Sequence, residues 1–394
     1  MPASPSTARA INDRVALQLL QQEGPLTAGQ LKLLTGLSRP TVADLVERLA
    51  ASGLIAVVGE AGEQRRGPNA KLYGIVTDRA QLAALDVRTE GVWVVVSDLV
   101  GQVLAEASVP IGDDTGTGPA VEQAVALVER VVKEAGADRL HTVGIGAPGL
   151  IDPVTGELRD SSGLPAWHRR LATALQERLP EARVSVENET NLAALAEQRD
   201  GAAQDRDTFV LLWLGHGTGA AVVLDGTLRR GASGGTGEIG FLPVPGTTGL
   251  PSATDCEGGF HTLAGSSAIA ELAKRYGVTA DAGPYEPVAA GLVRAAVNSR
   301  TADADRFLDA LADRVAVGAA SVVAILDPGC VVLGGEVGQA GGEELAGRVE
   351  ARLRRMSPLP TEVRAGALGG GAVLRGALLT ARDRAQEELF APGR

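Results

Sequence analysis

Apolar positions at the start of the chain recur at helical spacing. A first helix, which Gly24-Pro25 ends, is predicted by the apolar side chains of Ile11, Val15, Leu17, Leu19 and Leu20. Thr27 and Gln30 have the spacing of a capping box, which predicts a second helix through Leu34. Ser38 suits the N-cap of a third helix that runs to about residue 52, with a proline in its first turn and Gly53 as its stop.

The short turn at residues 35–37 joins the second and third helices as in a helix-turn-helix. The side chains expected to face base edges and phosphates in a major groove are those of Ser38, Arg39, Pro40, Thr41 and Asp44. Strands are predicted at 54–58 and 71–75, and Arg65 and Arg66 near the tip of the intervening loop suit contact with DNA. The alternative is a three-helix protein-interaction module with solvated loop arginines. Residues 1–78 are therefore predicted to form a winged helix-turn-helix DNA-binding domain.

Strands and helices alternate through residues 79–394. A strand, turn and strand at 82–97 are followed by a tight turn, and the same pattern returns at 209–224. Helices are predicted elsewhere at 118–134, 167–179, 266–276, 287–298 and 302–326. The repetition suggests two similar α/β lobes with mixed sheets and a cleft between them.

Polar side chains interrupt this pattern where an apolar strand ends at Glu187-Asn188-Glu189. A helix of small residues follows, and Thr190 or Asn191 is expected to be its N-cap. Carboxylates and an amide at a strand end suit recognition of a hydroxyl-rich ligand. The alternative is an acidic capping turn that binds nothing.

Composition narrows the class of protein. The 394 residues are 45% hydrophobic and 22% charged, which is ordinary for a globular chain of two or three domains. No stretch has the length of a membrane span, no signal-peptide pattern opens the chain, and Cys256 and Cys330 give no disulfide framework. The predicted location is the cytoplasm. Residues 1–78 carry 8 Lys and Arg against 7 Asp and Glu, whereas the remainder carries 29 against 41, so only the N-terminal part suits DNA.

An ordered series of motifs resembles the ROK family of repressors, open reading frames and sugar kinases. The series consists of Gly144-Ile145-Gly146-Ala147-Pro148-Gly149, Leu164-Pro165-Ala166-Trp167, Glu187-Asn188 with Asn191, Gly217-Thr218-Gly219, Gly237-Glu238-Ile239-Gly240 and Gly334-Gly335. The resemblance implies a two-lobed actin-like (ribonuclease H-like) ATPase-type domain over residues 79–394. Its lobe boundary would lie near residue 200, and its C-terminal helix would return to the first lobe. The preceding winged helix matches the family's repressor branch.

Several positions depart from the pattern that the family's kinases need. After Asp86, where those kinases have a glycine-rich phosphate loop, this chain has Arg88, Thr89 and Glu90, although Gly217-Thr218-Gly219 is kept. Glu189 stands at the position of the catalytic-base aspartate. The extra methylene moves its carboxylate by about 1.5 Å, and a misplacement of about 1 Å can cost on the order of a hundredfold in rate.

The family's zinc motif is also altered. Phe241 replaces its histidine, the cysteine positions align with Ser252, Thr254 and Gly259, and Cys256 falls out of register. No cofactor and no metal are therefore expected. The ligand contacts that the resemblance leaves are Gly149, Asn188, Glu189, Glu238 and His261, while Gly163 supplies no side chain where an asparagine is frequent. His261 could equally be a loop histidine without a ligand, and Trp167 is expected to pack within its lobe.

The sequence as a whole predicts a DNA-binding transcriptional regulator, controlled by a sugar or sugar derivative and without kinase activity. Its partners would be operator DNA and a sugar-like effector, with no membrane, and the chain would form a homodimer or homotetramer. One alternative is an ATP-dependent sugar kinase that carries a DNA-binding head. Another is an architectural DNA-binding protein that needs no ligand.

Overall fold

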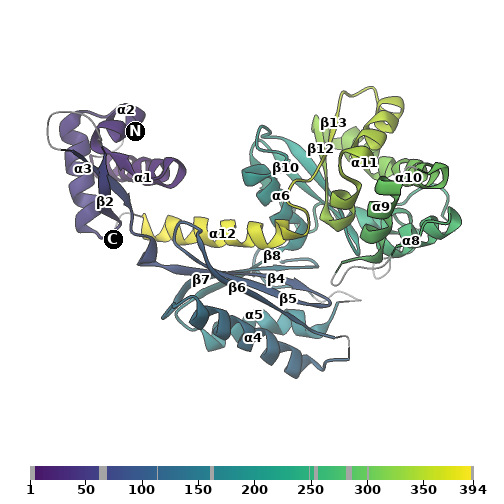
Figure 1. Ribbon diagram of the computed structural model, residues 1–394, viewed down its shortest axis with the longest axis horizontal. Coiled ribbons are helices and arrows are strands. Elements are labelled where there is room, and N and C mark those ends of the chain that lie inside the picture. The colour runs from purple at the N-terminus through teal and green to yellow at the C-terminus, as the bar shows by residue number, and fades with distance from the viewer. Residues whose placement is uncertain are drawn as a thin grey trace.

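The computed structural model describes residues 5–61, 69–112, 114–159, 164–247, 249–252, 256–280, 286–299 and 301–391. Arg65 and Arg66, predicted at the wing tip, lie outside these residues, as do Gly163 and Thr254. The chain forms an N-terminal head followed by two α/β lobes, which Figure 1 shows as a purple part and two larger sheet-containing parts.

The head contains three helices and a small antiparallel sheet. The helices are α1 (Pro5–Glu23), α2 (Ala28–Thr35) and α3 (Arg39–Ala51), and the sheet has the order β1-β3-β2, with β1 (Leu26–Thr27), β2 (Ile55–Ala61) and β3 (Ala70–Ile75). The predicted capping box is confirmed, because the Thr27 hydroxyl accepts from the Gln30 amide and the Gln30 side chain accepts from the Thr27 amide. The Ser38 hydroxyl caps α3 as predicted. The two-residue strand β1 was not predicted, since it is too short to show a pattern.

Lobe 1 is a five-stranded sheet of order β6-β5-β4-β7-β8. Its strands are β4 (Gln81–Arg88), β5 (Gly91–Asp98), β6 (Val103–Pro110), β7 (Leu140–Ala147) and β8 (Arg183–Asn188). Helices α4 (Thr117–Glu134) and α5 (Ala166–Arg178) cover one face, with Trp167 buried in that core as expected (Figure 1). A short 3₁₀ helix, η1 (Thr77–Arg79), links the head to β4.

Lobe 2 repeats the sheet of lobe 1. Its order is β11-β10-β9-β12-β13, with β9 (Phe209–Leu214), β10 (Thr218–Leu224), β11 (Thr227–Arg229), β12 (Cys330–Gly334) and β13 (Glu362–Ala365). In both sheets three antiparallel strands are followed by two parallel ones. One face packs on helices from the set α7 (His261–Ala264), α8 (Ser266–Arg275), α9 (Val288–Ser299), α10 (Ala302–Leu326) and α11 (Gly335–Met356). The predicted pair of duplicated α/β lobes is therefore confirmed.

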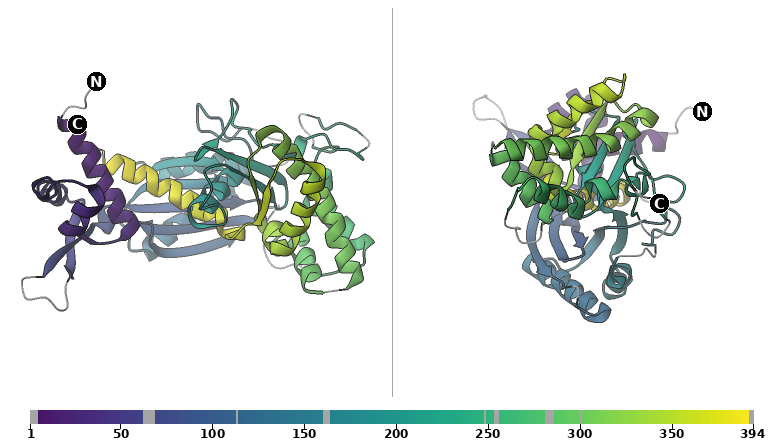
Figure 2. Two further views of the ribbon diagram at one scale, coloured as in Figure 1. Left: turned by 90° about the horizontal axis from the view of Figure 1, so that it is seen from above. Right: turned by 90° about the vertical axis from the view of Figure 1, so that its right-hand side faces the viewer.

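Two helices connect the parts. Helix α6 (Glu189–Asp200) follows β8 and touches β9 and β10 of lobe 2. Helix α12 (Ala372–Leu389), preceded by the 3₁₀ turn η3 (Gly369–Gly371), packs on α6, β4 and β7 and then runs to the head (Figures 1 and 2). One continuous apolar core joins Leu17 and Leu20 of the head to Leu99 of lobe 1 and to Phe390 at the end of α12.

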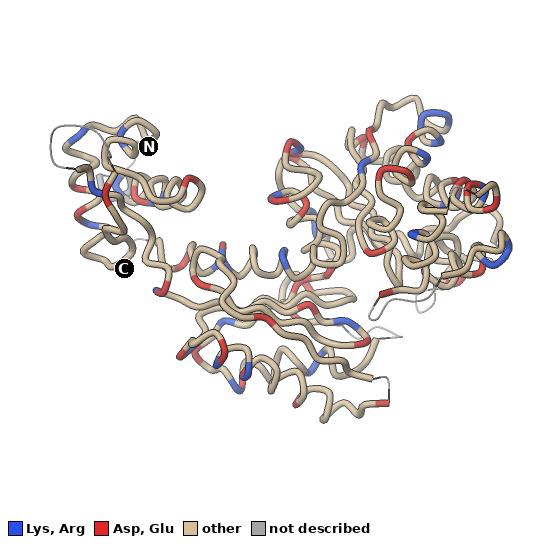
Figure 3. Tube along the Cα trace, viewed as in Figure 1, with Lys and Arg blue, Asp and Glu red and all other residues tan. Residues whose placement is uncertain are grey.

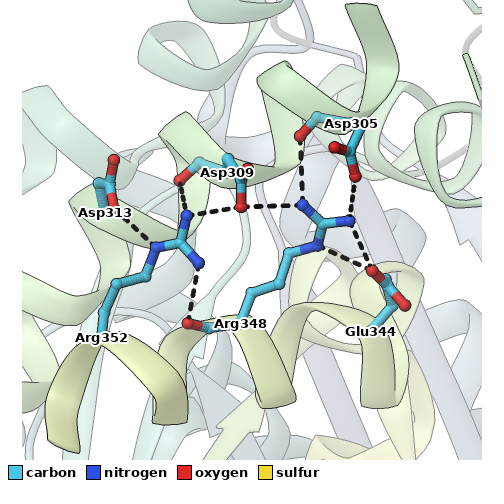
Figure 4. A network of polar contacts seen from close by, with 6 residues as sticks. All are labelled: Asp305, Asp309, Asp313, Glu344, Arg348 and Arg352. Atoms are coloured by element: carbon cyan, nitrogen blue, oxygen red, sulfur yellow. Dashed lines mark hydrogen bonds and ion pairs between the residues drawn. The ribbon is translucent and has the colours of Figure 1, made fainter. Parts of the chain in front are cut away.

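A ladder of ion pairs joins α10 to α11 on the outer side of lobe 2 (Figure 4). Arg348 and Arg352, one helical turn apart on α11, reach carboxylates spaced at the same interval on α10. The partners are Asp305, Asp309 and Asp313 on α10 and Glu344 on α11. The ladder lies beyond Gly342, where the backbone leaves helical geometry, so it fixes the distal part of α11.

Charged positions of both signs are interspersed along the head and the lobes (Figure 3). Over the described residues, each helix falls short of the length and apolar character required to cross a bilayer.

Candidate functional site

The predicted polar stretch lies where β8 passes into α6 without a loop. Asn188, in extended conformation, is the N-cap: its Oδ1 accepts from the amides of Thr190 at 2.9 Å and Asn191 at 3.2 Å. The prediction that Thr190 or Asn191 caps this helix was wrong. Both residues already lie in the first turn and are buried, because the helix begins at Glu189, directly after the strand ends at Asn188.

Asn188 and Gly149, two of the predicted ligand contacts, are brought together. The Asn188 Nδ2 donates to the Gly149 carbonyl at 2.9 Å. Gly149 has a φ of 103°, which favours glycine at the sharp turn after β7. Since the amide oxygen caps α6 and one N–H holds the Gly149 loop, Asn188 has one N–H left for a ligand.

Glu187, named in the motif but not predicted as a site residue, bonds across the two lobes. Its Oε1 accepts from the Asn188 amide and from Asn191 Nδ2, each at 3.0 Å. Its Oε2 accepts from Arg230 Nε at 2.6 Å, and Arg230 directly follows β11 of lobe 2. Sequence reasoning had no signal for this pair, because the partners are 43 residues apart in different lobes.

Glu189 begins α6 and is partly buried beside other acidic groups. Burial, together with the nearby charges of Asp86 and Glu336, raises the pKa of its carboxyl to about 8. At neutral pH this carboxyl is therefore mainly protonated, and a protonated carboxyl can donate a hydrogen bond to a ligand oxygen.

Arg88, at the end of β4, connects both lobes and the start of α12. Its Nε and Nη2 donate to Asp86 Oδ2 at 2.9 and 2.7 Å, and its Nη1 donates to Glu336 Oε1 of α11 at 3.2 Å. Its Nη2 also donates to the Gly370 carbonyl at 2.6 Å, and the guanidinium lies 4.7 Å from the centre of the Trp93 ring. Each of the three guanidinium nitrogens of Arg88 therefore donates to a partner within the protein.

Asp86 is 1% exposed, and among the described residues its Oδ1 has no hydrogen-bond partner. Burial raises the pKa of Asp86 to about 6, against the opposing effect of Arg88. The carboxylate is thus held in its charged form by one guanidinium.

The β4–β5 turn faces the β9–β10 turn across the lobes. Glu90 of the first turn lies 3.7 Å from His216 Nε2 of the second. Burial disfavours the charged form of Glu90, but the nearby His216 ring and a hydrogen bond from the Thr89 hydroxyl outweigh it and lower its pKa to about 2. The second turn is closely packed, because a Cβ on Gly215 would lie 3.0 Å from Glu336 Oε2.

Glu238 and His261 lie in lobe 2, beside this arrangement. Glu238 is exposed and precedes the 3₁₀ helix η2 (Ile239–Phe241), and its loop packs on lobe 1, where a Cβ on Gly234 would lie 1.9 Å from the Ile151 carbonyl. His261 starts α7 and is partly buried against Gly265. The structure thus joins Gly149, Asn188 and Glu189 at one junction and brings the Glu238 loop to it.

The predicted DNA contacts occupy the first turns of α3. Ser38, Arg39, Pro40 and Asp44 are exposed and Thr41 is half-buried. Ser38 and Thr41 hydroxyls lie 2.7 Å apart. The Asp44 carboxylate pairs with Arg48. Arg48 also donates to Asp13 of α1 at 2.6 Å, so this arginine holds α3 against α1.

Among the described residues, no group of three or more His, Cys, Asp or Glu side chains is placed to hold a metal ion. Cys256 is half-buried and Cys330 is buried in β12, where burial raises the pKa of its thiol to about 11. The expectation of no cofactor stays a prediction.

Three comparisons identify the relatives of this chain. A xylose repressor of Caldicellulosiruptor bescii is 26% identical over 242 residues, which are 60% of this chain and 59% of that protein. A crystal structure of a ROK family transcriptional regulator, a homolog of the E. coli MLC protein, superposes with a TM-score of 0.75 at 21% identity over 97% of this chain and 98% of that one. A ROK family glucokinase from Streptomyces griseus, in complex with glucose and AMPPNP, has a TM-score of 0.65 at 26% identity over 77% and 99% of the two chains.

The alignment with the curated repressor therefore spans about three fifths of that protein's length. The likeness to the solved transcriptional regulator shows that the two chains share a fold. Residues 82–384 match the ROK family, which is most of the chain. The chain belongs to the ROK family.

Proposed function

We propose that this protein is a DNA-binding transcriptional regulator, a repressor controlled by a sugar or sugar derivative that binds between the lobes. The observation that carries the proposal is a head with the elements of a winged helix, joined by α12 to the junction between the lobes. Kinship with a xylose repressor and with a ROK transcriptional regulator supports it. In this proposal α3 enters the major groove of operator DNA, and two copies bind a two-fold site.

The residues at the junction support binding without phosphoryl transfer. At the position where the family's kinases have an aspartate as catalytic base, Glu189 carries one extra methylene, which moves the carboxylate by about 1.5 Å. Arg88, Asp86 and Glu336 fill the turn after β4 with a closed set of ion pairs. The second candidate, a sugar kinase with a DNA-binding head, is favoured by the kept Gly217-Thr218-Gly219 loop and by the similarity to a glucokinase.

Helix α12 offers a route from the ligand to the head. At its start, Gly370 accepts from Arg88, and the Glu197 carboxylate of α6 accepts from the amides of Ala367 at 3.1 Å and Leu368 at 2.9 Å. At its end, Gln386 Nε2 donates to Gln21 of α1 at 2.8 Å and to the Leu99 carbonyl at 2.9 Å. A ligand that prefers one relative position of the lobes would shift α12 and hence the head, by no more than its difference in affinity for the two states.

The first experiment is a thermal-shift screen against sugars, followed by a gel shift on the promoter beside the protein's own gene. A bound effector raises the melting temperature by mass action and changes the operator affinity. An architectural protein without a ligand would show no shift with any sugar. Robust ATP-dependent phosphorylation of a hexose at ordinary enzyme concentration would favour the kinase instead.

The head is tested by two arginine substitutions. Arg39→Ala should weaken operator binding and relax base preference, because Arg39 is exposed in the first turn of α3. Arg65→Ala should weaken binding about equally for all sequences, as expected for a backbone contact. Unchanged affinity in both variants would contradict this docking.

A further inference from the structure

Each of the two arginines that cross the junction between the lobes already has its counter-ions within the protein. Arg88 is paired with Asp86 and Glu336, and its side chain is 17% exposed. Arg230 is paired with Glu187 through a 2.6 Å hydrogen bond. Carboxylates from both lobes therefore already pair with the two guanidinium groups that could otherwise bind an anionic ligand.

In the part of the chain that the structure describes, Glu90 and Glu189 at the junction add no free cation. Glu90 is ionised, with its pKa near 2, and it is paired with His216. Glu189 is neutral near pH 7 and would gain a negative charge if a ligand removed its proton. A phosphate group carries a charge of about −1.5 to −2 at neutral pH, so it would meet carboxylates rather than free cations.

Glu336 stands in the first turn of α11, whose N-cap is Gly334. A negative charge in the first turn of a helix is favourable because of the helix dipole. A Cβ on Gly215 would lie 3.0 Å from Glu336 Oε2, so the second turn closes over the same carboxylate. The Glu336 carboxylate of α11 thus pairs with Arg88 and lies beside Gly215 of the β9–β10 turn.

We propose that Glu336, with Asp86, is an internal anion that determines ligand specificity: it keeps Arg88 from binding phosphate and restricts the site to uncharged, hydroxyl-rich ligands. This inference rests on the proposed function, since it names the class of effector for the same site. It predicts that sugars are effectors and that their phosphate esters are not.

The direct test uses inorganic phosphate as the probe and compares wild type with Glu336→Gln by isothermal titration calorimetry at low ionic strength. Removing the charge while keeping the shape releases Arg88 Nη1 from its ion pair with Glu336, so phosphate affinity should rise at least tenfold. Glu344→Gln, on the exposed distal part of the same helix, is the matched control and should leave phosphate affinity at the wild-type level. Arg88→Gln added to Glu336→Gln should abolish the gain, which locates it at Arg88.

Wild type alone provides a second measurement if Glu336→Gln does not fold. In thermal shift, glucose, xylose and N-acetylglucosamine are compared with glucose 6-phosphate and N-acetylglucosamine 6-phosphate. Stabilisation by an uncharged sugar but not by phosphate esters supports the inference. Phosphate binding to wild type as tight as to a folded Glu336→Gln, or stabilisation by the phosphate esters, would overturn it.

The outcome is separate from that of the proposed function. Operator binding that responds to a phosphorylated sugar would leave the regulator intact and remove only the specificity. A gain of phosphate affinity in Glu336→Gln without any operator binding would support the specificity and contradict the proposed regulator.

Discussion

The two turns that face each other across the lobes differ more than the sheets that carry them. Both lobes have the same strand order and directions, and in each the turn follows the central strand. The β9–β10 turn keeps glycines at 215, 217 and 219, and a Cβ on Gly219 would lie 3.2 Å from Thr190 Oγ1. The β4–β5 turn instead carries Arg88, Thr89 and Glu90, and fills the space with ion pairs.

Two lobes can therefore keep the same sheet while the chemistry of one turn changes. The sheet requires only alternating apolar residues, whereas the turn decides what can approach it. In our proposal the charged turn binds no ligand group. Instead, its Arg88 contacts Glu336 of lobe 2 and Gly370 at the start of α12.

The largest expected effect comes from removing the cation of the charged turn. Arg88→Met leaves Asp86, which is 1% exposed, without its counter-ion, and should lower the free energy of unfolding by about 3–5 kcal/mol. Urea denaturation monitored by circular dichroism measures it. Adding Asp86→Asn should restore part of the loss, because the buried charge is then gone. Equal stability of Arg88→Met and wild type would mean that the ion pair does not hold the turn.

A second prediction concerns pH. The folded-state pKa of Glu189, about 8, lies above its ordinary value, so the stabilisation it confers is complete below about pH 4.5 and is lost as pH rises through 8. Wild type should lose on the order of 2–4 kcal/mol between pH 5 and pH 8 from this group. Asp86, with its pKa near 6, acts in the same direction at lower pH.

Glu189→Gln provides the control for this pH dependence. The neutral amide resembles the protonated carboxyl, so the variant should match wild type at pH 5 and be more stable at pH 8. Denaturation curves at both pH values give the difference. A parallel decline in both proteins would place the titrating group elsewhere.

These sites show which features local sequence can predict. The capping box at Thr27 and the proline in α3 act within one helical turn, so their roles follow from neighbouring residues. The cap at Asn188 was misplaced by two or three residues because several polar residues in a row could each serve. The partner of Arg88 is 248 residues away, and Glu197 accepts from amides about 170 residues away. No local pattern encodes such pairs, since they form only when the lobes fold together.

A smaller effect is expected from the pair that joins the two turns directly. The side chain of His216 is 61% exposed, and the Glu90 carboxylate 3.7 Å away raises its pKa. Its contribution is present below its ordinary pKa and is lost as pH rises through the raised value. After allowance for solvent screening, His216→Gln should cost about 0.5 kcal/mol at pH 6 and nothing at pH 9. An equal cost at both pH values would exclude an ionic contribution.

The smallest effect is expected in the ladder of Figure 4, which also pairs arginines with several carboxylates. Its carboxylates are exposed, with Asp309 at 46%, whereas Asp86 is buried at 2% by side chain. Asp313→Asn should therefore cost about 0.3 kcal/mol or less, because exposed ion pairs are screened by water and salt. A loss comparable to that of Arg88→Met would show that burial does not explain the difference.

The most direct test of the proposed regulation is a fluorescence anisotropy titration of labelled operator DNA with the protein. The titration is run without ATP, in the presence and absence of a sugar that stabilises the protein. The prediction is that the sugar alone changes the operator Kd at least fivefold. An operator Kd that is unaffected by the bound sugar, or that changes only when ATP is added and the sugar is phosphorylated, would contradict it.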